Sequence, residues 1–186
     1  MQRSSFNGLF VLRLKRMGQG GVTVLSALLL AFMILHAVKW VSPLGAMVWH
    51  YKGINFDLPV WCSSEPGIQA NSREPTYYFL KNRKFSTRWK TWLHVPVSTN
   101  YTFASLCEGG IRVYIDENLI IDGWNKKGFY SSGKHADLRL SEGMHALRVE
   151  YFNDNRESRM RLEWEGGPIP PRTVVGGSFL MKRVKE

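Results

Sequence analysis

The stretch "GGIRVYIDENLIIDGW", Gly109 to Trp124, decides the fold of this chain. Within it Ile111, Val113 and Ile115 alternate with other residues, and apolar residues resume after a short Asp-Glu-Asn segment. Alternation with a period of two is typical of a strand with one buried face, and Asp and Asn favour tight turns. The stretch therefore predicts a β-hairpin.

The hairpin also contains three carboxylates, Asp116, Glu117 and Asp122, which raise the question of an acid/base site. Glycoside hydrolysis needs two carboxyl groups about 5 to 9.5 Å apart across a cleft, and a hairpin turn is convex and exposed. Turn and capping roles are the preferred interpretation. The chain has no Gly-x-Ser-x-Gly motif, and its histidines lack a metal-ligand spacing. We predict a protein that is not an enzyme and has no catalytic or metal-binding residues.

The rest of the C-terminal part repeats the pattern of the hairpin. Short apolar alternations are separated by Gly, Asn, Asp and Pro, and no long segment has a helical period. Such a pattern is typical of an all-β protein, here an antiparallel β-sandwich. The predicted strands are Ser86–Val95, Asn100–Leu106, Ile111–Ile115, Leu119–Asp122, Ala136–Leu140, His145–Phe152 and Arg159–Glu165.

The N-terminal part contains an apolar run, Val22 to Val38, without a charged residue. A membrane-spanning helix needs about 17 to 25 such residues, so we predict one transmembrane helix over 20–42, ended by Pro43. The alternative is a cleaved signal peptide, which the length of the run and the poor cleavage sites after it disfavour.

The charges that flank the run predict its orientation. Arg3, Arg13, Lys15 and Arg16 precede the run and no acidic residue accompanies them, so the N-terminus is predicted to be cytoplasmic. The C-terminal domain is then periplasmic or extracellular. Basic and aromatic residues near the end of a span contact lipid headgroups. The predicted contacts of the membrane anchor are His36, Lys39, Trp40 and Trp49.

These features divide the chain into five parts. They are a cytoplasmic tail (1–19), the transmembrane helix (20–42), a linker and irregular first part of the exported domain (43–84), the sandwich core (85–181) and a basic tail (182–186). The net charge is +10, but much of the excess lies in the two terminal segments. Without a basic patch between them, we expect no nucleic-acid partner.

A longer pattern resembles a known family. It consists of a Phe-x-x-Arg-Trp strand, a Tyr-Thr-Phe strand, the Gly-x-Arg-x-Tyr-Ile-Asp hairpin ending in Trp, a Gly-x-His turn before Glu-Tyr-Phe, and a Leu-x-Trp strand, all between Phe85 and Trp164. In this order the elements are similar to those of the protective-antigen (PA-fourteen) β-sandwich domain family. The resemblance covers about residues 50 to 180.

The resemblance implies a sandwich of the kind attached to glycosidases, adhesins, toxins and cell-surface proteins, several of which bind carbohydrate. The adhesin branch binds it through a calcium ion held by adjacent aspartates. This chain has Cys107, Glu108, Gly109 and Gly110 where the family commonly has Asp-Asp-Gly. Calcium needs about 6 to 8 oxygen ligands, so we expect neither that calcium site nor any other cofactor.

Cys62 and Cys107 are the only cysteines, and both lie on the predicted exported side, where disulfides persist. A bridge between them would stabilise the domain by about 3 to 4 kcal/mol. We favour the bridge over two separate thiols because of the compartment and the even number.

The predicted function is that of a non-enzymatic, single-pass accessory or scaffolding subunit, whose exported sandwich packs on a membrane protein complex. The alternative is a membrane-tethered carbohydrate-binding module. In either case loops on a rigid scaffold are the best place for a partner or glycan. The residues predicted to form this site are Glu108, Trp124, Asn125, Lys126, Lys127 and Tyr130.

Overall fold

The computed structural model describes residues 19–71, 77, 80, 84–124, 134–154 and 158–182. The chain forms two compact units, Met1–Ser42 and Pro43–Glu186. The first contains helix α2 (Gln19–Val41). Over the side chains that the structure describes, no helix offers an apolar stretch of the length needed to cross a membrane.

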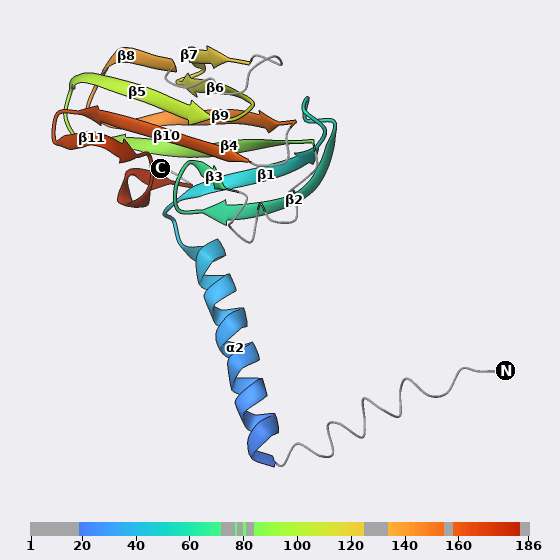
Figure 1. Ribbon diagram of the computed structural model, residues 1–186. Coiled ribbons are helices and arrows are strands. Elements are labelled where there is room, and N and C mark those ends of the chain that lie inside the picture. The colour runs from blue at the N-terminus through green and yellow to red at the C-terminus, as the bar shows by residue number, and fades with distance from the viewer. Residues whose placement is uncertain are drawn as a thin grey trace. The chain divides into compact units, whose positions relative to one another are not determined.

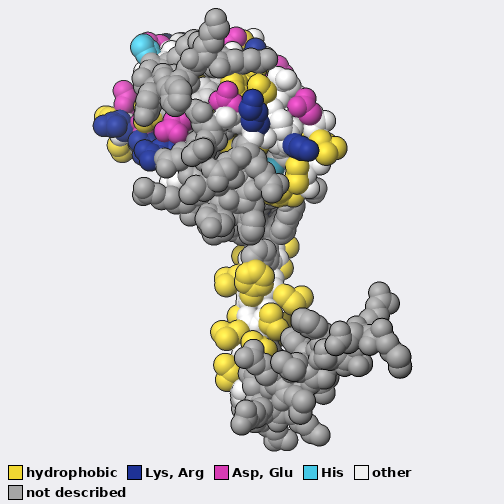
Figure 2. All heavy atoms as spheres, turned by 45° about the vertical axis from the view of Figure 1, so that its right-hand side comes forward, with side chains coloured by type: hydrophobic (Ala, Val, Ile, Leu, Met, Phe, Trp, Pro, Cys, Tyr) yellow, Lys and Arg dark blue, Asp and Glu magenta, His cyan; other side chains and the backbone are white. Residues whose placement is uncertain are grey.

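Helix α2 carries exposed apolar side chains along its length. Leu35 is 68% exposed, Met33 is 66% exposed and Leu28 is 63% exposed. Figure 2 shows such hydrophobic side chains gathered around the helix. An apolar face of this kind needs a partner other than water, because exposed apolar surface is unfavourable in water.

The second unit consists of strands, and the prediction of an all-β, antiparallel sandwich is confirmed. Every described strand pairing is antiparallel. The strands are β1 (Ala46–Lys52), β2 (Leu58–Glu65), β3 (Gln69–Asn71), β4 (Phe85–Val95), β5 (Thr99–Cys107), β6 (Gly110–Ile115), β7 (Asn118–Gly123), β8 (Lys134–Leu140), β9 (Gly143–Asn153), β10 (Arg159–Gly166), β11 (Ile169–Val174) and β12 (Leu180–Met181).

The strands form two sheets (Figure 1). A seven-stranded sheet has the order β2-β1-β4-β9-β6-β7, with β12 paired to β4. A five-stranded sheet has the order β11-β10-β5-β8, with β3 paired to β10. Strands β4 and β9 pair from Phe85↔Asn153 to Val95↔Gly143 and form the centre of the larger sheet.

The core lies between the two sheets and is rich in aromatic rings. Trp89 of β4 is fully buried, and Trp164 of β10 stacks on Tyr101 with ring centroids 5.4 Å apart. Trp164 also stacks on Phe103, at 5.9 Å. Among the residues that the structure describes, the buried core runs from Ala46 to Leu180, so the second unit has a core of its own and is expected to fold without the helix.

All seven predicted strands are present, within two residues at each end. The segment 43–84, expected to be a linker and the irregular first part of the exported domain, contains the regular strands β1, β2 and β3. Trp49, predicted to be a contact of the membrane anchor, lies in the middle of β1 opposite Arg88 of β4. The side chains of His36, Lys39 and Trp40 lie outside the described part of the chain.

Candidate binding face

The outer face of the seven-stranded sheet carries a group of half-buried and exposed polar and aromatic residues. Along β4, Phe85, Trp89 and Leu93 point into the core. The alternate residues are half-buried or exposed, because successive side chains of a strand point to opposite faces. The outward side chains of β4 are Arg88, Lys90, Trp92 and His94.

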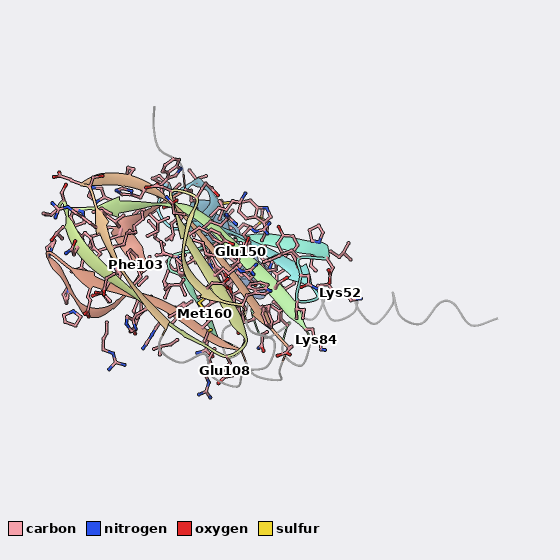
Figure 3. All side chains as sticks on the ribbon, turned by 90° about the horizontal axis from the view of Figure 1, so that it is seen from above. Lys52, Lys84, Phe103, Glu108, Glu150 and Met160 are labelled. Atoms are coloured by element: carbon pink, nitrogen blue, oxygen red, sulfur yellow. The ribbon has the colours of Figure 1, made fainter. Side chains whose placement is uncertain are left out.

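An ion-pair network crosses the middle of this face. Oε1 of Glu150 accepts hydrogen bonds from Nε of Arg88 and Nη1 of Arg148, both at 2.9 Å. Arg148 also donates from Nη2 to Glu117, at 2.9 Å. Glu150 is only 5% exposed, and Figure 3 shows it over the central strands. Two strands, β4 and β9, and the β6–β7 turn are thus joined through charged groups.

The network fixes the charge of Arg148. Burial lowers the pKa of the Arg148 guanidinium, but its hydrogen bonds and charge attraction to Glu117 and Glu150 outweigh that effect and raise the pKa. Its guanidinium also lies over the ring of Tyr114, 3.7 Å from the centroid. Arg148 is therefore a rigid structural cation.

An aromatic cluster lies at the end of the face where β4 begins. We call this the aromatic end. Trp124 stacks on Phe56 with ring centroids 5.6 Å apart and meets Phe152 edge-on at 4.7 Å. The guanidinium of Arg112 lies 4.9 Å from the Trp124 centroid, and that of Arg88 lies 4.2 Å from the Phe56 centroid. Trp124, predicted to belong to the partner or glycan site, is half-buried by these contacts.

The glycines at the start of β6 are needed for this packing. A Cβ atom on Gly110 would lie 2.1 Å from the ring of Phe152. Gly109 has a φ of +99°, and its Cβ atom would lie 2.0 Å from the carbonyl oxygen of Phe152. The Gly-Gly pair therefore lets the chain approach the β9 strand closely, which only glycine permits.

A shallow groove of about 480 Å³ extends over the other end of the face, where β4 meets β12. We call it the basic groove. Its apolar lining includes Met47, Trp49 and Trp92. Lys90 and Lys182 line the same end, and the Lys90 ammonium lies 5.9 Å from the centroid of Trp49.

The three hairpin carboxylates have separate structural partners, which confirms their interpretation as turn and capping residues. Asp116 and Glu117 have positive φ values of 48° and 62°, as a tight hairpin turn requires. Asp116 accepts hydrogen bonds from the Ala146 amide at 2.8 Å and contacts Nδ1 of His145 at 2.6 Å. Asp122 pairs with Nε of Arg112 at 3.3 Å.

The residues predicted to form the partner or glycan site are only partly described. Glu108 follows β5, close to Met160 of β10, and its carboxylate lies 3.9 Å from Nε of Arg159 (Figure 3). Trp124 belongs to the aromatic end. Asn125, Lys126, Lys127 and Tyr130 lie outside the described residues. Whether these residues bind a ligand stays a prediction.

The two cysteines are free thiols, so the favoured disulfide does not form in this structure. A bridge needs Cα atoms within about 7 Å of each other. Cys62 of β2 instead lies opposite Trp49 on the neighbouring strand of the larger sheet. Cys107 of β5 lies opposite Met160 in the smaller sheet. Burial raises the pKa of the Cys62 thiol, which keeps it in the neutral form.

A buried polar cluster lies on the inner side of β1. Nε2 of the fully buried His50 lies 3.0 Å from Oγ of Ser63 and 3.8 Å from Oε1 of Glu65. The Glu65 carboxylate accepts hydrogen bonds from Nε1 of Trp89 at 2.9 Å and from the Tyr77 hydroxyl at 3.2 Å. Burial lowers the pKa of His50 from 6.5 to about 4.

Ser63, His50 and Glu65 are the residue types of a hydrolase triad, but their geometry is different. In a triad the serine and the carboxylate contact opposite ring nitrogens of the histidine. Here both contact Nε2, while Nδ1 lies 3.3 Å from Oγ1 of Thr87. The cluster is therefore a structural network beneath the sheet.

Comparison with known proteins identifies the fold. The model of the PA14 domain family matches residues 63–174. The chain belongs to the PA14 domain family. The anti-sigma-I factor RsgI3 of Acetivibrio thermocellus is 36% identical to it over 88 residues, which are 46% of this chain and 13% of RsgI3. The chain thus spans a small part of that relative.

Solved structures share the PA14 fold at low identity. An anti-sigma factor domain-containing protein from Clostridium clariflavum is 22% identical, with a TM-score of 0.67, over 77% of this chain and 48% of that one. The Epithelial Adhesin 9 A domain of Candida glabrata, in complex with Galβ1-4GlcNAc, is 11% identical, with a TM-score of 0.57, over 75% of this chain and 89% of that one. These likenesses show the fold alone.

Sequence reasoning missed most of the outer face of this PA14 domain. Arg88, Lys90 and Trp92 alternate along one predicted strand, so their common face was accessible from the sequence. Trp49 and Lys182 were assigned to a membrane interface and a basic tail. They join the same face through pairing between strands that are distant in sequence.

Proposed function

We propose that this chain is a membrane-tethered, non-enzymatic binding module. Its PA14 sandwich recognises a ligand on the periplasmic or extracellular side, and the N-terminal helix holds it at the membrane with the N-terminus in the cytoplasm. The observation that carries the binding role is the outer face of the larger sheet, where aromatic rings and ion pairs line a shallow surface.

The tether is supported by the sequence and by the exposure of the helix. Val22 to Val38 contains no charged residue, and the described side chains of Thr23 to Leu35 are exposed. Four basic residues precede the run, which favours a cytoplasmic N-terminus. A lipid environment would remove the exposed apolar side chains from water.

We expect the full-length chain to stay in the membrane pellet through an alkaline carbonate wash, because a spanning helix is released only by detergent. The segment 43–186 alone should be recovered in the supernatant of cells that export it. Both fractions are measured by immunoblot. Release of the full-length chain by carbonate would contradict the tether.

Carbohydrate is the ligand class that we propose for the aromatic end. The solved adhesin domain of the same fold holds a disaccharide, and aromatic rings provide flat apolar surfaces for sugar rings. Trp124 lies beside Arg112, so an apolar surface and a hydrogen-bond donor are adjacent at the surface. The segment after Trp124, predicted to complete this site, lies outside the described residues.

We expect the segment 43–186 to bind members of a glycan array, and Trp124→Ala to weaken the binding at least about tenfold, as for a central aromatic contact. Leu119→Ala is the control, because it removes an exposed apolar side chain from the same hairpin at its turn. Unchanged binding by Trp124→Ala, with a normal unfolding transition, would place the ligand elsewhere.

The second candidate is an accessory or scaffolding subunit of a membrane protein complex. It is favoured by the edge strand β2, where Leu58 is 57% exposed and Val60 is 53% exposed. An edge strand with apolar side chains offers both backbone hydrogen bonds and apolar surface to a partner. Extraction in mild detergent as part of a larger assembly would support this candidate. Extraction as a free chain would support the independent binding module.

A further inference from the structure

The basic groove lies where the chain joins the sandwich. The amide of Lys182 donates a hydrogen bond of 2.8 Å to the carbonyl oxygen of Pro43. The amide of Gly45 donates one of 2.9 Å to the carbonyl oxygen of Leu180. Oγ1 of Thr91 lies 2.9 Å from the carbonyl oxygen of Gly45. The start of the domain, its last strand and the end of β4 are thus held together.

Pro43 follows the last residue of helix α2 by two positions in the sequence. Thr91 and Lys182 line the groove and contact this start of the domain. Only a short stretch of chain therefore separates their contacts from the end of the proposed anchor. The aromatic end lies at the opposite end of β4, where Phe152 faces Ser86. The basic groove thus lies at the end of the outer face that is connected to the anchor by few residues. The aromatic end lies at the opposite end of this face.

The groove end has the composition of a membrane interface. Trp92 is 36% exposed and Leu44 is 43% exposed, and both lie beside Met181. Trp49 lines the groove as well. Tryptophan is enriched at the level of lipid headgroups because its ring is apolar and its N–H is polar. Lysine near an interface reaches the headgroups with its ammonium group.

The charge of the groove is positive. Four cations line it, Arg88, Lys90, Arg148 and Lys182, and Glu117 is its one carboxylate among the described residues. Glu150, which binds both arginines, offsets a second charge, so two positive charges remain. The two arginines are held in the ion-pair network, and Lys90 and Lys182 lie outside that network.

Lys182 would gain from an anion beside it. Burial lowers the pKa of its ammonium group, which means that the charged form is incompletely solvated there. An anionic headgroup would compensate for that loss. The sequence after Lys182 adds Arg183 and Lys185, which increase the positive charge close to the groove in the chain.

We propose that the basic groove docks on anionic phospholipid headgroups, with Lys90 and Lys182 contacting phosphate and Trp49 and Trp92 entering the interface. This inference rests on the proposed tether, which brings the groove close to a bilayer. Docking would hold this end of the domain on the lipid and leave the aromatic end free for ligand.

The test uses vesicle flotation of the segment 43–186, which carries the complete core. Vesicles contain either phosphatidylcholine alone or phosphatidylcholine with phosphatidylglycerol. We expect binding to the anionic vesicles only, weakening as salt is added. The double variant Lys90→Glu/Lys182→Glu should lower the partition coefficient at least about tenfold, because two basic contacts with an anionic surface are reversed.

The matched control is Lys52→Glu/Lys84→Glu, which changes the net charge equally. Both lysines are exposed, and Figure 3 shows them together at the other end of the larger sheet, where Lys52 faces Phe85. We expect this control to bind anionic vesicles at least about ten times better than the groove variant. Equal losses in the two double variants would overturn the proposal, because binding would then follow net charge alone.

Three further outcomes test the inference separately from the proposed function. If the segment binds a soluble uronate polymer but not anionic vesicles, the groove is a site for acidic polysaccharide and the lipid proposal is wrong. If carbonate releases the full-length chain while the segment still binds anionic vesicles through Lys90 and Lys182, the tether fails and the groove stands. If the full-length chain stays in the membrane and the segment binds neither vesicle type, the lipid-docking proposal is wrong and the tether stands.

Discussion

Lowering the pH from above 6.5 toward 4 is expected to destabilise the sandwich through His50. Burial lowers the pKa of His50 from 6.5 to about 4 in the folded domain. Between these values the unfolded chain takes up a proton that the folded domain does not. The contribution of a neutral His50 to stability is therefore fully present above pH 6.5 and is lost as the pH falls toward 4, by up to about 3 kcal/mol.

The geometry explains why the folded domain resists this proton. The His50 ring is fully buried and lies between Trp61, with centroids 4.7 Å apart, and Tyr77. Glu65 lies 3.8 Å from Nε2, but its carboxylate already accepts hydrogen bonds from Trp89 and Tyr77. A protonated ring would lose its hydration, and the Glu65 carboxylate at 3.8 Å from Nε2 is too far for a short ion pair that would offset the loss.

Urea unfolding of the segment 43–186 at several pH values measures the effect. The variant His50→Gln keeps polar atoms near Ser63 and Thr87 but cannot titrate. It is expected to be less stable than the wild type at neutral pH and to lose less stability as the pH falls. Parallel pH profiles for the two proteins would mean that other groups cause the acid sensitivity.

Glu150→Ala is expected to lower the free energy of unfolding by about 2 to 3 kcal/mol. Glu150 is 5% exposed and binds both Arg88 and Arg148, so its removal leaves two largely buried guanidinium groups without their shared carboxylate. The loss should be smaller than for a fully buried pair, because the side chains of Arg88 and Arg148 remain 27% and 25% exposed.

Glu117→Ala provides the matched control. Glu117 binds the same Arg148, also at 2.9 Å, but its side chain is 77% exposed. An exposed ion pair contributes little, so the expected change is within about 0.5 kcal/mol. Both variants are compared with the wild type by urea unfolding at neutral pH. Equal losses for Glu117→Ala and Glu150→Ala would show that the burial of the carboxylate does not set the strength of the network.

The strands predicted correctly are those whose sequence alternates and whose ends carry turn residues. In β4, Trp89 and Leu93 alternate with Lys90 and Trp92, and the structure buries the first pair and exposes the second. The hairpin turn at Asp116 is also predicted correctly, because a turn residue affects only the backbone close to it. Local patterns of this kind are visible in the sequence because they need no distant contact.

Strand β1 shows where such reasoning stops. Its residues also alternate, with Val48 buried and Trp49 half-buried, yet the proximity of the apolar run favoured a membrane interface for Trp49. Its pairing with β4 spans about forty residues of sequence, from Trp49 to Arg88. The gain from such a pairing depends on the whole sheet, so the short sequence does not reveal it.

The sequence by itself determined the antiparallel sandwich, the central hairpin and the PA14 family resemblance, because alternation and turn chemistry act over a few residues. The tertiary structure decided which side chains meet. It placed Cys62 and Cys107 in different sheets, packed Trp124 against Phe56, and placed Lys182 beside Trp92. The physical reason is that strand order and register are set by contacts between distant segments, and a local pattern specifies only which face of each strand is buried.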